Sequence, residues 1–367
     1  MKNNNTMHLN DCFFTEKKRL LMEYEGLRVS LFRYETGVAA LEVGNKRGGF
    51  IILPYQGQQI WRCCFDGREL TMNSMFDEPV RTRDYLSTYG GFFLHCGATA
   101  IGVPSKDDDH PLHGELPNAP YREAYISCGA DENGSYIIVG GKYEHKVAFN
   151  HRYLAEPQVK IHENSSILDV SMQITNLLKT QMELMYLAHI NFSPVDHAKL
   201  AYTADYDPQH VDVNINIPDH IKTSVPIGEF KAFLQKLKEN PAIHHHIDPK
   251  ALYDPEVVMS IQYKADNEGM AHSMQIHPDG YADYVAHRPL QLPKALRWIA
   301  RNPNEDAMGL VLPATSGNNG YLAEKAAGNY ITLLAGGSTR FDLRVGLLTP
   351  EESRKMSTKI DSIKGMA

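Results

Sequence analysis

Two histidines stand in segments whose residue types could support acid/base chemistry. In HPLHGELPN, residues 110–118, Pro111 and Pro117 restrict the backbone on either side of His113, and Gly114 permits a tight bend directly after it. Such a loop presents an imidazole with little conformational freedom left to lose, as proton transfer requires. A rigid surface turn uses the same residues, so this segment by itself leaves both interpretations open.

The second histidine lies in ELMYLAHINF, residues 183–192, which is apolar on both faces of a predicted strand. His189 and Asn191 share one of these faces, where burial without partners costs about 1–3 kcal/mol for each group. They therefore need hydrogen-bond partners or a ligand. A pair satisfied within the core and a pair that faces a ligand are both compatible with the pattern.

A third segment, YGGFFLHCGA at residues 89–98, places His95 beside Cys96. Imidazole and thiolate groups bind zinc or iron, so His95, Cys96, His113 and His189 together form a candidate metal set. The usual spacings of such ligands are absent, and we therefore predict no metal and no other cofactor.

Two further segments have both structural and functional interpretations. The run HHH at 244–246 follows a predicted helix at 229–240, and because adjacent side chains diverge on any regular element, we interpret it as a solvated loop. Trp298, between Arg297 and Ile299, is either a buried structural residue or an apolar platform for a sugar ring.

The composition restricts the class of protein and of partner. Apolar residues make up 43% of the 367-residue chain and charged residues 22%, which are ordinary values for a globular protein with a sizeable core. A formal net charge of −7 argues against nucleic acid as a partner. The five cysteines lack the spacing of a disulfide framework, and no apolar segment is long enough to cross a membrane. We predict a cytoplasmic protein with no membrane partner.

These candidate residues are positioned by a mainly β chain. Short segments with period-two alternation predict an antiparallel sandwich or barrel, as in SSILDVSMQITN, where Leu168, Val170, Met172 and Ile174 share one face. Further strands are predicted at 28–34, 39–43, 49–54, 136–142, 256–264, 308–312, 330–334 and 340–347.

Two helices interrupt this pattern without defining a separate domain. Phe230, Phe233, Leu234 and Leu237 form one apolar stripe within a predicted helix at 229–240, inside a predicted, partly helical insertion at 204–250. At the C-terminus, Thr349, Pro350 and Glu352 predict a capped helix that begins a tail at 350–367. We expect residues 1–367 to form one domain.

Five motifs in order resemble the aldose 1-epimerase (galactose mutarotase-like) superfamily. They are GGFFLHCGA, PLHGELPN, YLAHINF, GLVLPATSG and LLAGGSTRFDLRVGLL, and the resemblance runs from about residue 30 to residue 348. It implies a large antiparallel β-supersandwich whose concave face binds a sugar. The histidines of the family match His113 and His189, and one of them acts as the acid toward the ring oxygen while a glutamate takes the proton of the anomeric hydroxyl.

The sequence departs from the family at that glutamate. Leu312, before Pro313, stands at the family's glutamate position, and leucine cannot accept a proton. One hypothesis places a relocated carboxylate at Glu115, two residues after His113 and on the same side of an extended backbone. The alternative is that Glu115 is a solvent-facing loop residue.

The sequence thus predicts a carbohydrate-binding isomerase or epimerase that acts at the anomeric centre. Its catalytic candidates are His113, His189 and Glu115, and its candidate substrate-binding residues are His95, Asn118, Asn191 and Arg288. The alternatives are a non-catalytic sugar-binding protein, because of Leu312, and a metal-dependent sugar isomerase that uses three of the histidines. The sugar and the oligomeric state are not specified by these residues.

Overall fold

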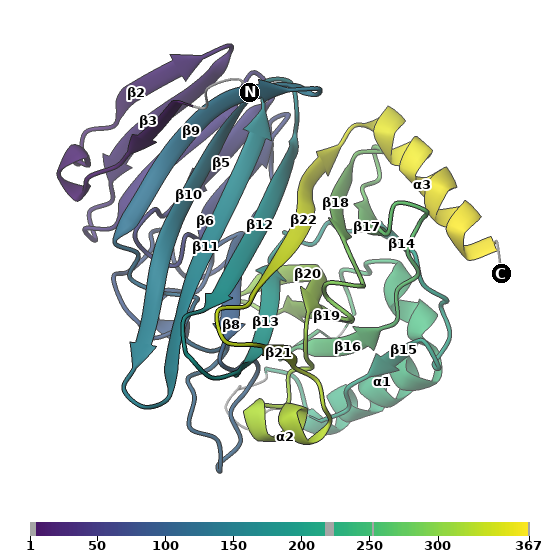
Figure 1. The fold of residues 1–367 in the computed structure, drawn as a ribbon. Helices are drawn as coiled ribbons and strands as arrows, with labels where there is room; N and C mark the ends of the chain where they lie inside the picture. The colour runs from purple at the N-terminus through teal and green to yellow at the C-terminus, as the bar shows by residue number, and fades with distance from the viewer. Residues whose placement is uncertain (1–4, 217–223, 252, 366–367) are drawn as a thin grey trace.

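Two antiparallel β-sheets lie face to face in the computed structural model, which describes residues 5–216, 224–251 and 253–365 (Figure 1). Within these residues the first sheet has nine strands, in the order β1 (Asn5–His8), β9 (Glu123–Asp131), β10 (Gly134–Val147), β11 (His151–His162), β12 (Ile167–Asn176), β22 (Ser338–Leu348), β18 (Ala282–His287), β17 (Ala271–Ile276) and β14 (Lys199–Tyr202). Because β22 pairs with both β12 and β18, the C-terminal strand joins the two halves of this sheet.

The second sheet carries the candidate residues of the 183–192 segment at its centre. Its strands follow the order β15 (Val211–Val213), β16 (Val257–Ile261), β19 (Lys294–Arg301), β20 (Asp306–Ala314), β13 (Met182–Ile190), β8 (Phe93–Ala98), β6 (Ile60–Phe65), β5 (Gly48–Ile52), β4 (Ala39–Asn45), β3 (Leu27–Arg33) and β2 (Arg19–Tyr24), with β7 (Arg68–Glu69) beside β6 and β21 (Ile331–Leu333) beside β13. The predicted antiparallel β architecture is confirmed.

In the described part of the chain three α-helices lie outside the sheets (Figure 1). They are α1 (Ile227–Glu239), α2 (Tyr321–Ala326) and α3 (Pro350–Gly365), and short 3-10 turns occur at Asp11–Phe13, Leu86–Thr88 and Pro241–His245. The apolar stripe of α1 is buried at Phe230, Leu234 and Leu237, as predicted. The capping box of α3 also forms, because the backbone N–H groups of Thr349 and Glu352 each donate to the other residue's side chain. No helix within the described residues is long and apolar enough to cross a membrane.

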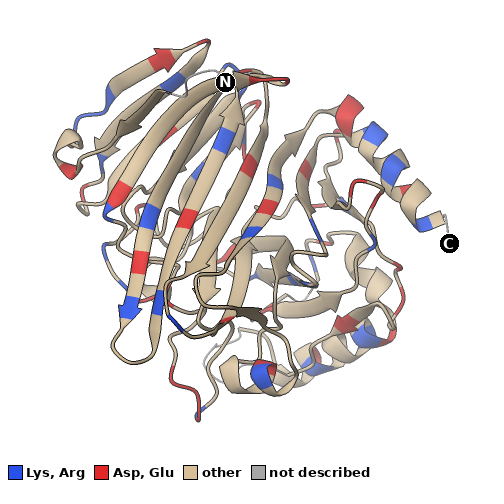
Figure 2. Cartoon of the chain, in the orientation of Figure 1, with Lys and Arg blue, Asp and Glu red and all other residues tan. Residues whose placement is uncertain are grey.

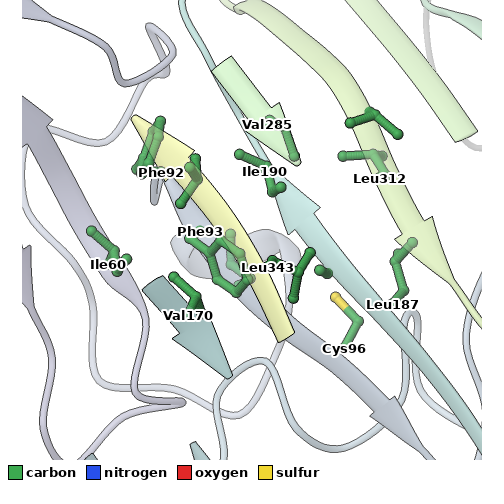
Figure 3. Packing of buried hydrophobic residues seen from close by; sticks show 14 of the residues in the cluster. Ile60, Phe92, Phe93, Cys96, Val170, Leu187, Ile190, Val285, Leu312 and Leu343 are labelled. Carbon is green, nitrogen blue, oxygen red and sulfur yellow. The ribbon is translucent and has the colours of Figure 1, made fainter. Parts of the chain in front are cut away.

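The core fills the space between the sheets. The predicted inward face of β12 is fully buried, with Leu168, Val170, Met172 and Ile174 at most 1% exposed. Figure 3 shows Val170 and Leu343, from the nine-stranded sheet, packed against Phe93 of β8 in the other sheet. Strand β13 is buried on both faces, as its apolar pattern predicted, since one face meets this core and the other carries His189.

Charged residues of both signs are interspersed along the elements that Figure 2 shows. Lysines, arginines and acidic residues alternate along the strands of the nine-stranded sheet and along α1 and α3 (Figure 2). Many of these groups are paired, as in Lys160 with Asp131 and Arg344 with Asp169.

The prediction that residues 244–246 form a solvated loop is wrong for His244. Its side chain is fully buried, and its Nε2 accepts a hydrogen bond of 2.7 Å from the guanidinium of Arg297, which lies over the ring of Tyr202. Burial, and then the charge of Arg297, hold the pKa of His244 well below its ordinary value. A neutral imidazole is the form that a buried arginine can donate to.

Candidate active site

A cavity of about 500 Å³ lies on the outer face of the second sheet. Alternate residues of four neighbouring strands form its floor, and they are Leu187 and His189 of β13, Leu312 of β20, Leu296, Trp298 and Ala300 of β19, and Val258 of β16. The alternation follows from the period-two geometry of a strand, which sends the intervening residues toward the core. The walls are loops at residues 75–76, 85–89, 102–103 and 112–113, with Asn318 and the 302–305 turn.

The HPLHGELPN loop holds His113 at the edge of this cavity. His113 has a left-handed backbone, with φ of 56°, and its N–H and C=O are hydrogen-bonded to Gly102 O and Gly97 N at 3.0 Å. Gly114 is required next, because a Cβ there would lie 2.4 Å from Ala100 O and 2.6 Å from Gly97 O. The rigidity expected from the prolines therefore also comes from the strand end and loop at 97–102.

His113 and His189 meet inside the cavity. Their ring centroids are 5.4 Å apart and the rings are nearly perpendicular, at 86°. Tyr85 lies 5.0 Å from the ring of His113, and the ring of Trp298 lies 5.5 Å from that of His189. The two histidines that sequence reasoning selected are thus neighbours, although 76 positions (189 − 113) separate them in the chain.

The hydrogen bond of His189 fixes its tautomer. Asn191 donates its side-chain N–H to Gly91 O at 2.9 Å, so its Oδ1 must accept the 2.7 Å bond from Nδ1 of His189. The proton therefore lies on Nδ1, and the lone pair of Nε2 is left for a ligand. Asn191 was predicted to bind substrate, but it is fully buried and does not line the cavity, and its side chain holds the ring of His189 instead.

Burial keeps both imidazoles neutral at pH 7. It lowers the pKa of His189 to about 4, against the smaller raising effect of the Asn191 hydrogen bond. Burial, followed by the neighbouring His189, holds the pKa of His113 well below its ordinary value. The Nδ1 atom of His113 is buried and has no protein partner within the described residues. Neutral imidazoles can accept protons as bases and donate N–H groups to oxygen.

The structure does not bring Glu115 to the histidine pair. Its buried carboxylate accepts hydrogen bonds from the backbone of Ala98 and Thr99, from the Thr99 hydroxyl at 2.7 Å and from the Tyr153 hydroxyl at 2.6 Å. Glu115 does not line the cavity. It is not the solvent-facing residue of the second hypothesis, and its contacts fasten the loop of His113 to the end of β8 instead of placing the carboxylate beside the histidine pair.

Three other predicted substrate-binding residues also lie away from the cavity. His95 faces the core between the sheets, where its Nδ1 is 2.7 Å from the Tyr186 hydroxyl, and burial lowers its pKa to about 3. Asn118 is buried and accepts from Gln59 at 2.7 Å. Arg288, at the end of β18, donates to Glu268 O at 2.7 Å.

The candidate metal set of His95, Cys96, His113 and His189 does not meet at one point. Side chains alternate along a strand, so His95 faces the core while His113 and His189 line the cavity on the other face of the sheet. Within the described residues no group of three potential ligands is arranged for a metal ion.

Two carboxyl groups that sequence reasoning did not select line the cavity. Glu256 precedes β16 and accepts the Trp298 indole N–H at 2.7 Å. Glu305 precedes β20, and its buried Oε2 atom has no hydrogen-bond partner within the described residues. Burial raises the pKa of Glu305 to about 7. Neither residue belongs to a recognisable motif, and only strand pairing between β16, β19 and β20 brings them to the cavity of the histidines.

Glu305 gives the site a measurable effect on stability. A carboxyl whose pKa rises from 4.5 to about 7 on folding destabilises the folded protein as pH increases through that window. Because Glu305 is partly exposed, the effect of this pKa shift on stability is discounted, and we expect Glu305→Gln to raise the free energy of unfolding by about 1–2 kcal/mol at pH 8. At pH 4 we expect no such increase. Urea unfolding at the two pH values measures this, and equal changes at both would contradict it.

Several solved structures superimpose on this chain. A structure of a provisionally assigned aldose 1-epimerase from Klebsiella pneumoniae superimposes with a TM-score of 0.81 over 99% of this chain and 96% of its own, at 17% identity. A galactose mutarotase-like protein from Clostridium acetobutylicum gives 0.57 over 89% and 100%, at 12% identity. A GalM/aldose epimerase homologue from C. elegans gives 0.51 over 85% and 99%, at 13% identity.

The chain has the galactose mutarotase-like fold. Its sequence also matches the family model of a domain of unknown function, DUF4432, over residues 35–198. This range includes both His113 and His189. A search of curated proteins finds no significant match. The galactose mutarotase-like fold implied by the five motifs is therefore confirmed, and the chemistry of the cavity rests on its own residues.

Proposed function

We propose that the protein binds an uncharged sugar or sugar derivative in this cavity and isomerises it at the anomeric centre. The observation that carries the proposal is the pair of neutral imidazoles, His113 and His189, 5.4 Å apart beside Trp298. The apolar face of an indole is a suitable platform for the C–H face of a sugar ring. The fold is one in which proteins described as aldose 1-epimerases and galactose mutarotase-like proteins occur.

A single proton suffices for the proposed reaction. Nε2 of His189 accepts the proton of the anomeric hydroxyl, the electron pair of that O–H bond forms the carbonyl group, and the bond between C1 and the ring oxygen breaks. The imidazolium of His189 then gives this proton to the ring oxygen that has just separated from C1. His113 donates an N–H to the oxygen on which negative charge develops. Reversal of these steps on the other face of the carbonyl produces the other anomer, and this route requires no carboxylate at Leu312.

The second candidate is a sugar-binding protein without catalytic activity. It is favoured by Leu312, whose apolar side chain lines the cavity, and by Glu115, whose carboxylate is bonded elsewhere. Both candidate functions predict saturable binding of a sugar. They differ only in whether bound sugar exchanges anomers faster than sugar in buffer.

Exchange spectroscopy by NMR tests this difference. Wild-type protein is mixed with neutral reducing hexoses and pentoses, and the rate of α/β exchange is compared with that in buffer and with the His113→Ala/His189→Ala double variant. Acceleration by the wild type alone supports the isomerase. Saturable binding without acceleration for every sugar supports the binding protein instead.

The charges of the cavity predict selection against anionic sugars. Its described lining residues include Glu256 and Glu305 but no lysine or arginine. A phosphate group carries a charge of about −1.5 to −2 at pH 7 and would find no cation there. We expect a hexose 6-phosphate to bind at least about tenfold more weakly than the same hexose, a difference of about 1.4 kcal/mol. Calorimetric titration at constant ionic strength measures it, and equal or tighter binding of the phosphate would show that the prediction is wrong.

A further inference from the structure

The cavity is more apolar than a site for one unsubstituted sugar needs to be. Besides Trp298, the four floor strands contribute Leu187, Leu312, Leu296 and Val258, none of which has a group that can hydrogen-bond to a hydroxyl. A sugar hydroxyl that loses water against such side chains loses hydrogen bonds without replacement. Much of this floor is therefore suited to a part of the ligand that has no hydroxyls.

The mouth of the cavity is apolar as well. Met75, Leu86 and Val103 line it and are 66%, 54% and 37% exposed. They come from three separate wall loops. Large apolar side chains that stay exposed around one opening are typical of a binding surface, whereas isolated ones need no explanation.

Two of the sets of polar groups that line the cavity lie at distant places along its floor. His113 and His189 are at one, next to Leu312, and Glu305 with Asn302 is at the other, on the turn between β19 and β20. Leu312 follows Glu305 by seven residues, which at roughly 3.3 Å per residue is about 23 Å along the strand. A volume of about 500 Å³ is also within the range of pockets for drug-sized ligands. One sugar ring at the histidines leaves the region between these places unfilled.

We propose that the ligand is an uncharged sugar derivative that carries an apolar substituent, such as an aryl or alkyl group. The sugar ring lies at His113 and His189, a placement that rests on the proposed function, and the substituent lies across the floor toward Met75 and Leu86. Where such a ligand also carries a hydroxyl or carbonyl group beyond its apolar part, the Glu305 carboxyl, with its unpartnered Oε2, accepts or donates a hydrogen bond there. The lack of a lysine or arginine in the described lining disfavours an anionic ligand.

Glycosides separate this inference from the proposed catalysis, because a blocked anomeric oxygen prevents ring opening but not binding. Calorimetric titrations compare glucose and galactose with their methyl, phenyl and n-octyl glycosides. The phenyl or octyl compound of at least one sugar is expected to bind at least tenfold more tightly than the methyl compound, with a more negative heat-capacity change.

The apolar rim supplies the matched variants. Met75→Ser/Leu86→Ser changes two exposed side chains and is expected to reduce the preference for the larger glycoside at least fivefold. Leu290→Ser, at a side chain 96% exposed and outside the cavity, is expected to leave it unchanged. Urea unfolding confirms that both variants are folded.

The possible results separate the two proposals. A preference below threefold, a preference that survives in the rim variant, or no binding of any glycoside overturns the inference about the substituent. If free sugars nevertheless exchange anomers faster in the presence of the protein, the isomerase proposal stands without it. A preference that the rim variant removes, with no acceleration of anomer exchange for any sugar, supports the inference and overturns the isomerase.

Discussion

Replacement of His189 with alanine is expected to lower the rate of anomer exchange by about 10²–10⁴-fold, the contribution typical of a positioned acid/base group. The physical reason is that the hydrogen bond to Asn191 holds the proton on Nδ1 of His189. The lone pair of Nε2 is then available to a ligand. Exchange NMR measures the rate. Urea unfolding and sugar titration serve as controls for folding and binding, and a folded variant within twofold of the wild-type rate would contradict the assignment.

Asn191→Leu tests whether Asn191 acts through His189. The leucine side chain is branched like that of asparagine but cannot accept the Nδ1–H, so the proton is no longer confined to Nδ1 and the exchange rate should fall. The hydrogen bond also raises the pKa of His189, whose value of about 4 otherwise reflects burial. Its loss should therefore move the acid limb of the rate profile to lower pH. A lower rate with an unmoved acid limb would indicate a purely structural role.

Replacement of Glu115 with glutamine is expected to destabilise the protein by about 2–4 kcal/mol, because four donors converge on its carboxylate. An amide nitrogen in place of one oxygen would face at least one of these donors. The midpoint of urea unfolding should fall with an unchanged slope. Activity should fall only as far as the His113 loop loses its position.

Tyr153→Phe is the matched control for Glu115. It removes one donor to Oε1 and leaves the carboxylate intact, so we expect a smaller loss, about 1 kcal/mol. A different result would support the hypothesis that Glu115 is a relocated base. If Glu115→Gln has wild-type stability and sugar affinity but no anomer exchange, Glu115 transfers a proton after all.

Local patterns predicted the elements that position the site. Period-two alternation identified β12, a run that is apolar on both faces identified β13, and the Thr349, Pro350 and Glu352 signature identified the start of α3. These features depend on neighbours a few residues away, so the sequence contains their full physical cause. The ordered motifs also selected His113 and His189, which the structure places together.

The tertiary structure decided which polar groups share the cavity. Glu115, His95 and Arg288 carry suitable chemistry but face other partners, and His244 is buried against Arg297 rather than solvated. Glu305, Glu256 and Asn302 belong to no motif, yet they line the cavity.

The physical reason is the geometry of sheets. The sequence alone indicated where several of the strands lie and which of their side chains share a face, because a strand alternates its faces with a period of two residues. Which strands become neighbours, which face meets the core and which loops rise around the other face depend on contacts between residues far apart in the chain. The pairing of β13 with β8 and β20, and of β19 with β16 and β20, therefore determined the cavity, its apolar floor and its carboxyl groups.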